Sequence, residues 1–230
     1  MSTSPIARGL AAACPVATGV AAVLSSALTP NTSSSTAGRI DAFAAHAGRV
    51  DAALTDDIFI VFLGAAPMLA ALLAWRHSPK LAGVAGWLGL ISGSAMIFLI
   101  TLDFAANAAV GVDHKAASKL LDNITDTPQF VPFLVLGLLG GIVAMVCLGI
   151  ALWRTHAVPR WAAVALIVYG PANVLTADAG SVPFAMANAL LLAGFTACAV
   201  AVLRDELPSF TADNAGSRPV ASAVNEAPAL

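Results

Sequence analysis

The sequence predicts an all-α integral membrane protein, a single bundle of six transmembrane helices with an amphipathic helix on its outer surface. Three observations carry this prediction. Hydrophobic residues make up 59% of the 230-residue chain and charged residues only 10%, whereas soluble domains carry about 25% charged residues. The apolar residues are gathered in runs long enough to cross a bilayer. The four tryptophans lie beside two short basic turns between these runs, as expected at one membrane face.

Six apolar runs form the predicted spans. A helix that crosses the hydrocarbon core of a bilayer needs about 20 residues. The five clearest runs are residues 58–75, 81–102, 130–153, 161–177 and 182–203. Residues 9–28 form the sixth run, which is rich in alanine and serine, so it is either a retained first span or a cleaved signal peptide. We favour the retained span because the run is long for the apolar segment of a signal peptide; cleavage would leave five spans.

The distribution of lysine and arginine predicts how the bundle is oriented. With the N-terminus inside, seven of the 11 basic residues lie on the cytoplasmic side and four on the outer side. The tight turns at residues 76–80 and 154–160 carry the clearest part of this excess, which follows the positive-inside rule. Residues 1–8 and residues 204–230 are then cytoplasmic, and the latter form a tail expected to be disordered. The alanine-rich composition is typical of bacteria, so the expected location is the plasma (inner) membrane.

Two segments between the spans carry helical patterns. A stripe of apolar residues at three- and four-residue spacing consists of Ile40, Phe43, Ala47, Val50 and Leu54. This spacing draws one apolar face and predicts an amphipathic outer helix over residues 38–56. In the second outer loop, Asp113 precedes a shorter helical pattern and is the expected N-cap residue.

The composition argues against several classes of function. A net charge of −2 and an isoelectric point near 6.0 give no basic field for nucleic acid. Cys14, Cys147 and Cys198 lie in separate apolar runs and form no C-x-x-C pair, as a thiol-redox enzyme would normally need. His46 and His114 lie near aspartates, but a zinc site requires a tighter cluster of ligands. We therefore predict no metal and no cofactor.

Polar residues gather at the outer ends of the predicted spans. Polar groups at membrane depth are costly, so they are candidates for function. The candidates for an outward-open pocket are Asn107, Asn173, Thr176 and Asn188. The favoured hypothesis is a non-catalytic membrane protein whose pocket accepts a small apolar or lipid-like ligand or a partner helix. The simpler interpretation is that helices end where polar residues begin, so that these side chains mark the water interface.

Two alternatives to this hypothesis come from other residues. Asp103 and Asp178 are expected to face each other at the rim of the pocket, and two carboxylates in a poorly solvated site can separate into an acid and a base. They are the catalytic candidates of a membrane-embedded enzyme of the cyclase or isomerase type. Gly137 and Gly141 form a small-x-x-x-small pair that lets helices approach closely. This pair indicates packing within one chain or between copies, and so a homo-oligomer or a membrane scaffold.

Two short motifs resemble a bacterial multipass membrane family. Residues 44–49 (Ala-Ala-His-Ala-Gly-Arg), which lead into the second span, look like a recurring element of the family catalogued as domain of unknown function 4386. The turn at residues 152–161 is similar to the penultimate segment of that family. The resemblance implies a small all-helical membrane bundle and brings no established activity, substrate or catalytic residue. Ala47 stands where the family often carries an acidic residue after the histidine, so His46 inherits no role.

Overall fold

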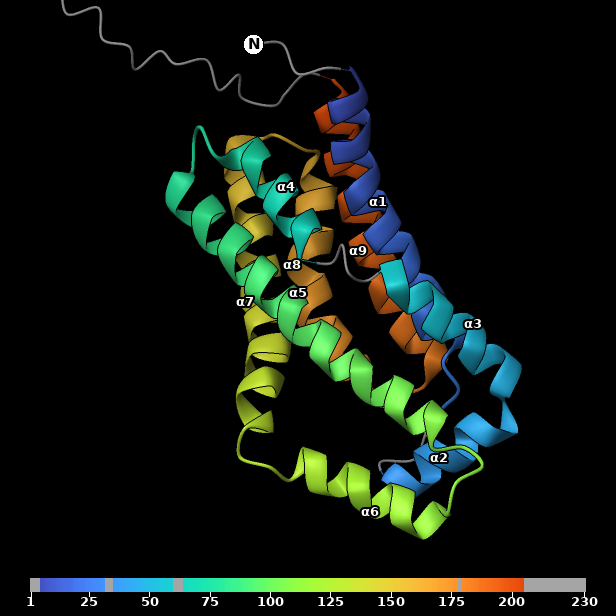
Figure 1. Cartoon of the computed structure of the whole chain (residues 1–230). Helices are drawn as coiled ribbons and strands as arrows, with labels where there is room; N and C mark the ends of the chain where they lie inside the picture. Colours follow the sequence, from blue (N-terminus) through green and yellow to red (C-terminus); the bar gives the residue numbers. More distant parts are fainter. Residues whose placement is uncertain (1–4, 32–34, 60–63, 178, 205–230) are drawn as a thin grey trace, which may run out of the picture.

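The computed structural model describes residues 5–31, 35–59, 64–177 and 179–204. Within these ranges the regular secondary structure is entirely helical, which confirms the all-α prediction (Figure 1). The helices are α1 (Pro5–Leu28), α2 (Thr36–Ala45), α3 (Ala47–Asp57), α4 (Ala65–Ala74), α5 (Pro79–Ala108), α6 (His114–Thr125), α7 (Phe130–Thr155), α8 (Arg160–Thr176) and α9 (Ser181–Leu203).

Four helices are long and apolar enough to cross a membrane: α1, α5, α7 and α9. They coincide with four of the predicted spans, although α5 continues for about six residues beyond the predicted end at residue 102 and so includes Asp103 and Asn107. The helix α8 has 17 residues and α4 has 10. The chain is therefore a helical membrane protein whose apolar helices contact lipid.

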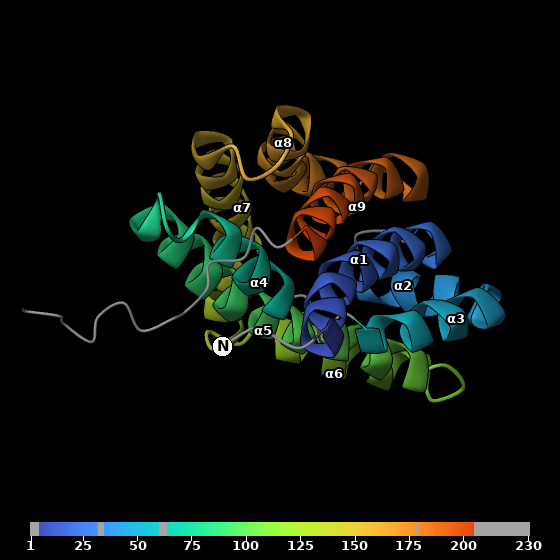
Figure 2. The same cartoon turned by 90° about the horizontal axis from the view of Figure 1, so that it is seen from above.

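The long helices pack in pairs, with α1 along α9 and α5 along α7, while α8 contacts both α7 and α9 (Figure 2). The turns at residues 75–79 and 156–159 lie at one end of the bundle, together with the start of α1 and the end of α9 (Figure 1). We call this end the basic-turn end. The opposite end is covered by α2, α3 and α6, and we call it the capped end (Figure 1).

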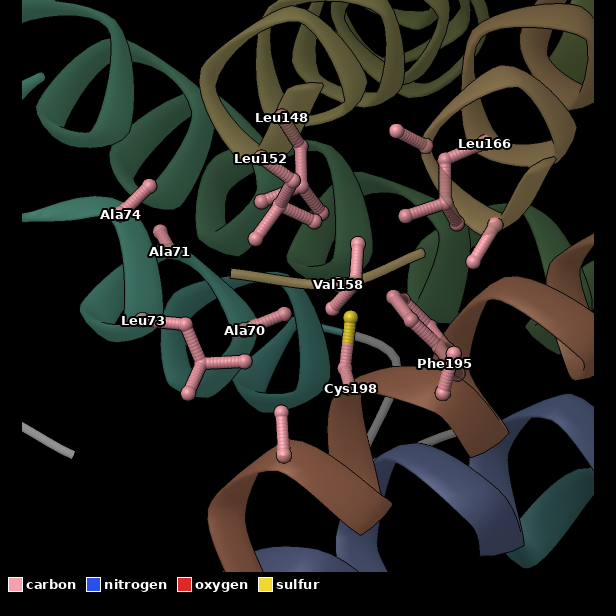
Figure 3. Close-up of a cluster of buried hydrophobic side chains, with 14 of the residues drawn as sticks. Ala70, Ala71, Leu73, Ala74, Leu148, Leu152, Val158, Leu166, Phe195 and Cys198 are labelled. Carbon is pink, nitrogen blue, oxygen red and sulfur yellow. The ribbon is translucent and has the colours of Figure 1, made fainter. Parts of the chain in front are cut away.

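The main hydrophobic core lies in the half of the bundle nearer the basic-turn end. Figure 3 shows part of it in close-up. It is built from alanines of α4 packed against large side chains of α7, α8 and α9, among them Leu148, Leu166 and Phe195, none of which is exposed. Glycine makes the closest helix approach possible, because a Cβ at Gly194 would lie 2.5 Å from Cγ of Leu166. This half of the molecule is thus filled by apolar side chains.

Gly137 and Gly141 of α7 face α5 of the same chain. A Cβ at Gly137 would lie 3.1 Å from Leu99, and one at Gly141 would lie 2.9 Å from Oγ of Ser92. The Ser92 hydroxyl also donates a hydrogen bond of 2.8 Å to the carbonyl oxygen of Gly137. The small-residue pair is therefore used for packing within the chain.

The single amphipathic helix predicted over residues 38–56 is wrong, because the structure has two helices, α2 and α3, that meet at His46. The His46 backbone leaves the helical region, with φ −129° and ψ 34°. Its ring Nδ1 lies 3.0 Å from the Ala42 carbonyl oxygen, the acceptor that the His46 amide would use in a continuous helix. The ring thus replaces a backbone bond and permits the bend.

The predicted span over residues 58–75 also differs from the structure. The described part of this segment is an α-helix only over Ala65–Ala74 (α4), and α3 ends before it at Asp57. Residues 60–63 lie outside the described ranges.

A second apolar cluster fixes the capped end. Its buried members come from α2, α3, α5 and α6, and they are Ile40, Phe43, Val50, Leu54, Ala106, Ala117 and Leu121. Asp113 is the N-cap of α6, as predicted, and its side chain accepts a hydrogen bond of 3.1 Å from the Lys115 amide. Polar contacts tie α6 to α2: the Thr36 hydroxyl donates to Asp122, and His114 lies 3.1 Å from Asp41. The cap is therefore a packed layer, not a set of loose loops.

Candidate functional site

A cavity of about 630 Å³ lies beneath the cap, in the half of the bundle that the main core does not fill. Residues of α1, α5, α8 and α9 line it, and α2 and α3 contribute Arg39, Phe43 and Asp57. Ligand pockets generally measure about 300–1,000 Å³ and combine apolar walls with a few polar groups. The apolar part of this wall includes Met96, Ile100 and Phe184.

Arg39 and Asp103 form an ion pair at the cavity. An Nη atom of Arg39, on α2, lies 3.2 Å from Oδ1 of Asp103, on α5, and both residues line the cavity. The two side chains are 43% and 34% exposed, so the pair is screened by water and contributes little to stability. Its main effect is positional, because it holds α2 over α5 at the cavity.

Asp57, the last residue of α3, is the buried charged group of the site. The residue is 9% exposed and lines the cavity. The Ser25 hydroxyl donates to its carboxylate, but Oδ1 has no hydrogen-bond partner among the described residues. Burial raises the pKa of Asp57, and the bond from Ser25 opposes part of that rise. The pKa of neighbouring Asp56 is also raised, first by burial and then by the charge of Asp57.

Two asparagines meet in the wall between α8 and α9. Asn188, which is 3% exposed, donates through Nδ2 to the Phe184 carbonyl oxygen at 3.2 Å. A carbonyl can only accept, so the Oδ1 of Asn188 must be turned toward Asn173, whose Nδ2 donates to it at 3.1 Å. This arrangement leaves Oδ1 of Asn173 as an acceptor that no other described residue uses. Both asparagines line the cavity.

The other residues singled out in the sequence lie elsewhere. Asn107 donates to Oδ1 of Asp51 at 3.3 Å, a contact between α5 and α3, and Thr176 donates to the Ala172 carbonyl oxygen at 2.7 Å within α8. Neither residue lines the cavity. Asp178 lies outside the described residues, so the pairing of Asp103 with Asp178 that the enzyme alternative requires is not tested.

Among the polar residues of the cavity wall, sequence reasoning proposed only Asp103, Asn173 and Asn188 as site candidates, and so missed Ser25, Arg39 and Tyr169 among others. Ser25 lies in the alanine- and serine-rich run 9–28, whose small residues fit a first span or a signal peptide and do not indicate a pocket. For Arg39 the sequence does contain a signal, its spacing from Phe43. It lies four residues before Phe43 on the apolar stripe, so one helical face presents both side chains, and both line the cavity.

A small void continues from the cavity into the bundle. Its volume is about 70 Å³, and Met96, Tyr169 and Asn173 line both spaces. The void is bordered by glycines of α5, α7 and α8, among them Gly141 and Gly170. The cavity at the capped end therefore extends toward the main core along a wall of small residues.

Comparisons with known proteins identify no relative. The chain has no significant match among family models, curated proteins or solved structures. The resemblance to domain of unknown function 4386 therefore stays a prediction. Among the described residues, no group of three or more His, Cys, Asp or Glu side chains is arranged to hold a metal ion.

Proposed function

We propose that this protein is a multi-pass protein of the bacterial plasma membrane that holds a small amphipathic ligand in the cavity at its capped end and catalyses no reaction on it. The composition of the cavity wall carries the proposal. Buried carboxyl and amide groups, Asp57 and Asn188 among them, share a space of about 630 Å³ with apolar side chains such as Ile100 and Phe184. This combination suits a molecule with a polar head and an apolar body.

In this proposal six segments cross the membrane. To α1, α5, α7 and α9 we add α8, whose 17 residues reach the lower limit of the usual span, about 17–25 residues, and the apolar stretch that contains α4. An even number of crossings agrees with the start of α1 and the end of α9 lying at the same end of the bundle (Figure 1). If the basic-turn end is cytoplasmic, as the positive-inside rule requires, both termini are inside and the cavity opens on the outer side.

We retain domain of unknown function 4386 as the proposed family, which adds no activity. We do not propose a separate scaffold role through Gly137 and Gly141, because the packing of both against α5 gives them a use within the chain. A homo-oligomer would have to form through another surface, such as the exposed apolar face of α7.

Native mass spectrometry of the gently solubilised protein tests the proposal. A bound small molecule or lipid should accompany the wild type. Ile100→Trp places a larger side chain in the cavity wall and should release it. Ile97→Trp is the matched control, since Ile97 lies on the same helix and is exposed on the outside, and it should retain the ligand. Equal retention by both variants, or no bound molecule in the wild type, would contradict the proposal.

A further inference from the structure

We infer that the ligand of this cavity carries a protonated amine and that Asp57 is its anchoring residue. This inference rests on the proposed function and makes it specific, because it names the chemistry of the ligand head. Arg39 and Asn173 are the other residues on which the argument depends.

The open oxygen of Asp57 is the first observation. The residue is 9% exposed, it lines the cavity, and Oδ1 has no partner among the described residues. The hydroxyl of Ser25 satisfies only part of the carboxylate. A buried charged group without its full set of hydrogen bonds is costly, so such a group normally has a partner. An ammonium group supplies both the opposite charge and up to three N–H donors.

The balance of charge in the cavity favours the same ligand. Among the described residues, the lining contains two carboxylates, Asp57 and Asp103, and one cation, Arg39. Arg39 is already paired with Asp103 at 3.2 Å. Asp57 is therefore left without a protein cation, and a ligand with one positive charge would neutralise the cavity.

The asparagine pair also favours a ligand that donates hydrogen bonds. The Nδ2 atoms of Asn173 and Asn188 both donate to protein oxygens, at 3.1 and 3.2 Å. Oδ1 of Asn173 accepts a hydrogen bond from no other described residue. The Ser26 hydroxyl likewise donates to the backbone of its own helix, to the Ala22 carbonyl oxygen at 2.8 Å. These side chains offer acceptors to a ligand, as an amine head requires, and they would not favour a carboxylate.

The remaining wall selects for an organic cation with an apolar body. Met96, Ile100 and Phe184 line the same space and provide no ligand for a small hydrated ion. Ca²⁺ takes six to eight oxygen ligands, and Mg²⁺ keeps a rigid octahedral shell. A primary amine attached to a short aromatic or aliphatic chain satisfies the carboxylate and the apolar wall together.

Three probes that share one apolar body test this inference: 4-phenylbutylammonium, 4-phenylbutanol and 4-phenylbutyrate. Binding to the full-length protein in nanodiscs is measured by titration at pH 7. The ammonium probe should bind wild type about tenfold more tightly than the alcohol, as expected for one charge-assisted contact, and the carboxylate should bind most weakly. In Asp57→Asn the preference for ammonium over alcohol should disappear while the alcohol still binds. Asp126→Asn, a change to an exposed residue of the α6 C-cap, should behave as wild type.

The outcomes separate this inference from the function on which it rests. Equal affinity of wild type for the ammonium and alcohol probes, or an unchanged preference in Asp57→Asn, overturns the inference and leaves a ligand-binding cavity. Failure of all three probes, together with no co-purified molecule, overturns the proposed function as well. The wild-type ranking needs no variant, so the test holds even if Asp57→Asn does not fold.

Discussion

At the scale of single residues, the buried polar groups of this protein divide into those that are satisfied and those that are not. Asn188 is 3% exposed and has partners for both its amide nitrogen and its oxygen. Asp57 is also buried, and its Oδ1 has no hydrogen-bond partner within the part of the chain that the structure describes. The satisfied bonds of Asn188 stabilise the packing of α8 against α9. The unsatisfied oxygen of Asp57 lowers stability, as is typical of a binding site without its ligand.

The raised pKa of Asp57 predicts how stability depends on pH. The folded protein binds the Asp57 proton more tightly than the unfolded chain, whose pKa is about 3.9, so this residue lowers stability progressively as pH rises from that value through the folded pKa. Asp57→Asn removes the charge and should raise the melting temperature at pH 7. The gain should shrink toward zero near pH 4. Thermal unfolding of both proteins across this range measures it, and a gain that does not depend on pH would contradict the account.

The asparagine pair gives a second prediction at this scale. Asn188→Ala removes the acceptor of Asn173 and leaves that half-buried amide without its partner, which should lower the free energy of unfolding by about 1–3 kcal/mol. Asn123→Ala changes an exposed residue of α6 and should alter it by less than about 0.5 kcal/mol. Denaturant unfolding compares the two variants, and similar losses in both would argue against a structural role for the pair.

At the scale of elements, the sequence predicted the long helices better than the short ones. The ends of α7 and α9 follow from the limits of their apolar runs, because in those segments the length of the apolar run alone determines where the helix begins and ends. The bend between α2 and α3 was not predictable from periodicity. Ile40 and Val50 belong to the same buried cluster, so the apolar stripe continues through the bend. A side-chain contact of His46 with the backbone makes the bend, and such contacts leave no periodic signal.

Close approach between helices gives a prediction for α7. A Cβ at Gly149 would lie 2.5 Å from Cγ1 of Ile167 and 2.7 Å from the Ala163 carbonyl oxygen, so Gly149→Ala should push α7 from α8 and cost about 1–3 kcal/mol. A Cβ at Gly140 would meet only Ser92, at 3.7 Å. Gly140→Ala should therefore be neutral or stabilise by up to about 1 kcal/mol through helix propensity. Melting temperatures that fall equally in both variants would show that packing is not the cause.

At the scale of the whole molecule, the two halves of the bundle have different contents. Apolar side chains such as Leu148 and Phe195 fill the half near the basic-turn end. The other half holds the cavity and its polar lining. The gathering of polar residues toward one end was visible in the sequence, and it pointed to Asn173 and Asn188, which line the cavity. The closure of that end over a cavity was not, because it depends on Arg39 reaching Asp103 across 64 positions of the chain.

The proposed orientation of the bundle predicts which residues impermeant reagents reach. In a background in which the native cysteines are replaced by alanine, Lys119→Cys on α6 and His77→Cys in a basic turn each add one exposed thiol. An impermeant thiol reagent should label Lys119→Cys on intact cells. His77→Cys should be labelled only after the cells are permeabilised. The reverse pattern would show that the protein has the opposite orientation. Labelling of both variants on intact cells would contradict the crossing of the membrane by α5, which lies between the two positions.

The capped half of the bundle is expected to enclose an accessible cavity, while the half near the basic-turn end is closely packed. Thiol accessibility measures this directly in the Cys14→Ala, Cys147→Ala background, which keeps Cys198 in the packed core. Ser26→Cys adds a thiol to the cavity wall at a residue that is 3% exposed, against 0% for Cys198. We predict that a small cationic thiosulfonate modifies Ser26→Cys rapidly and leaves Cys198 unmodified, as read by intact mass. Equal protection of the two thiols would show that the capped half is packed like the core and would contradict the account.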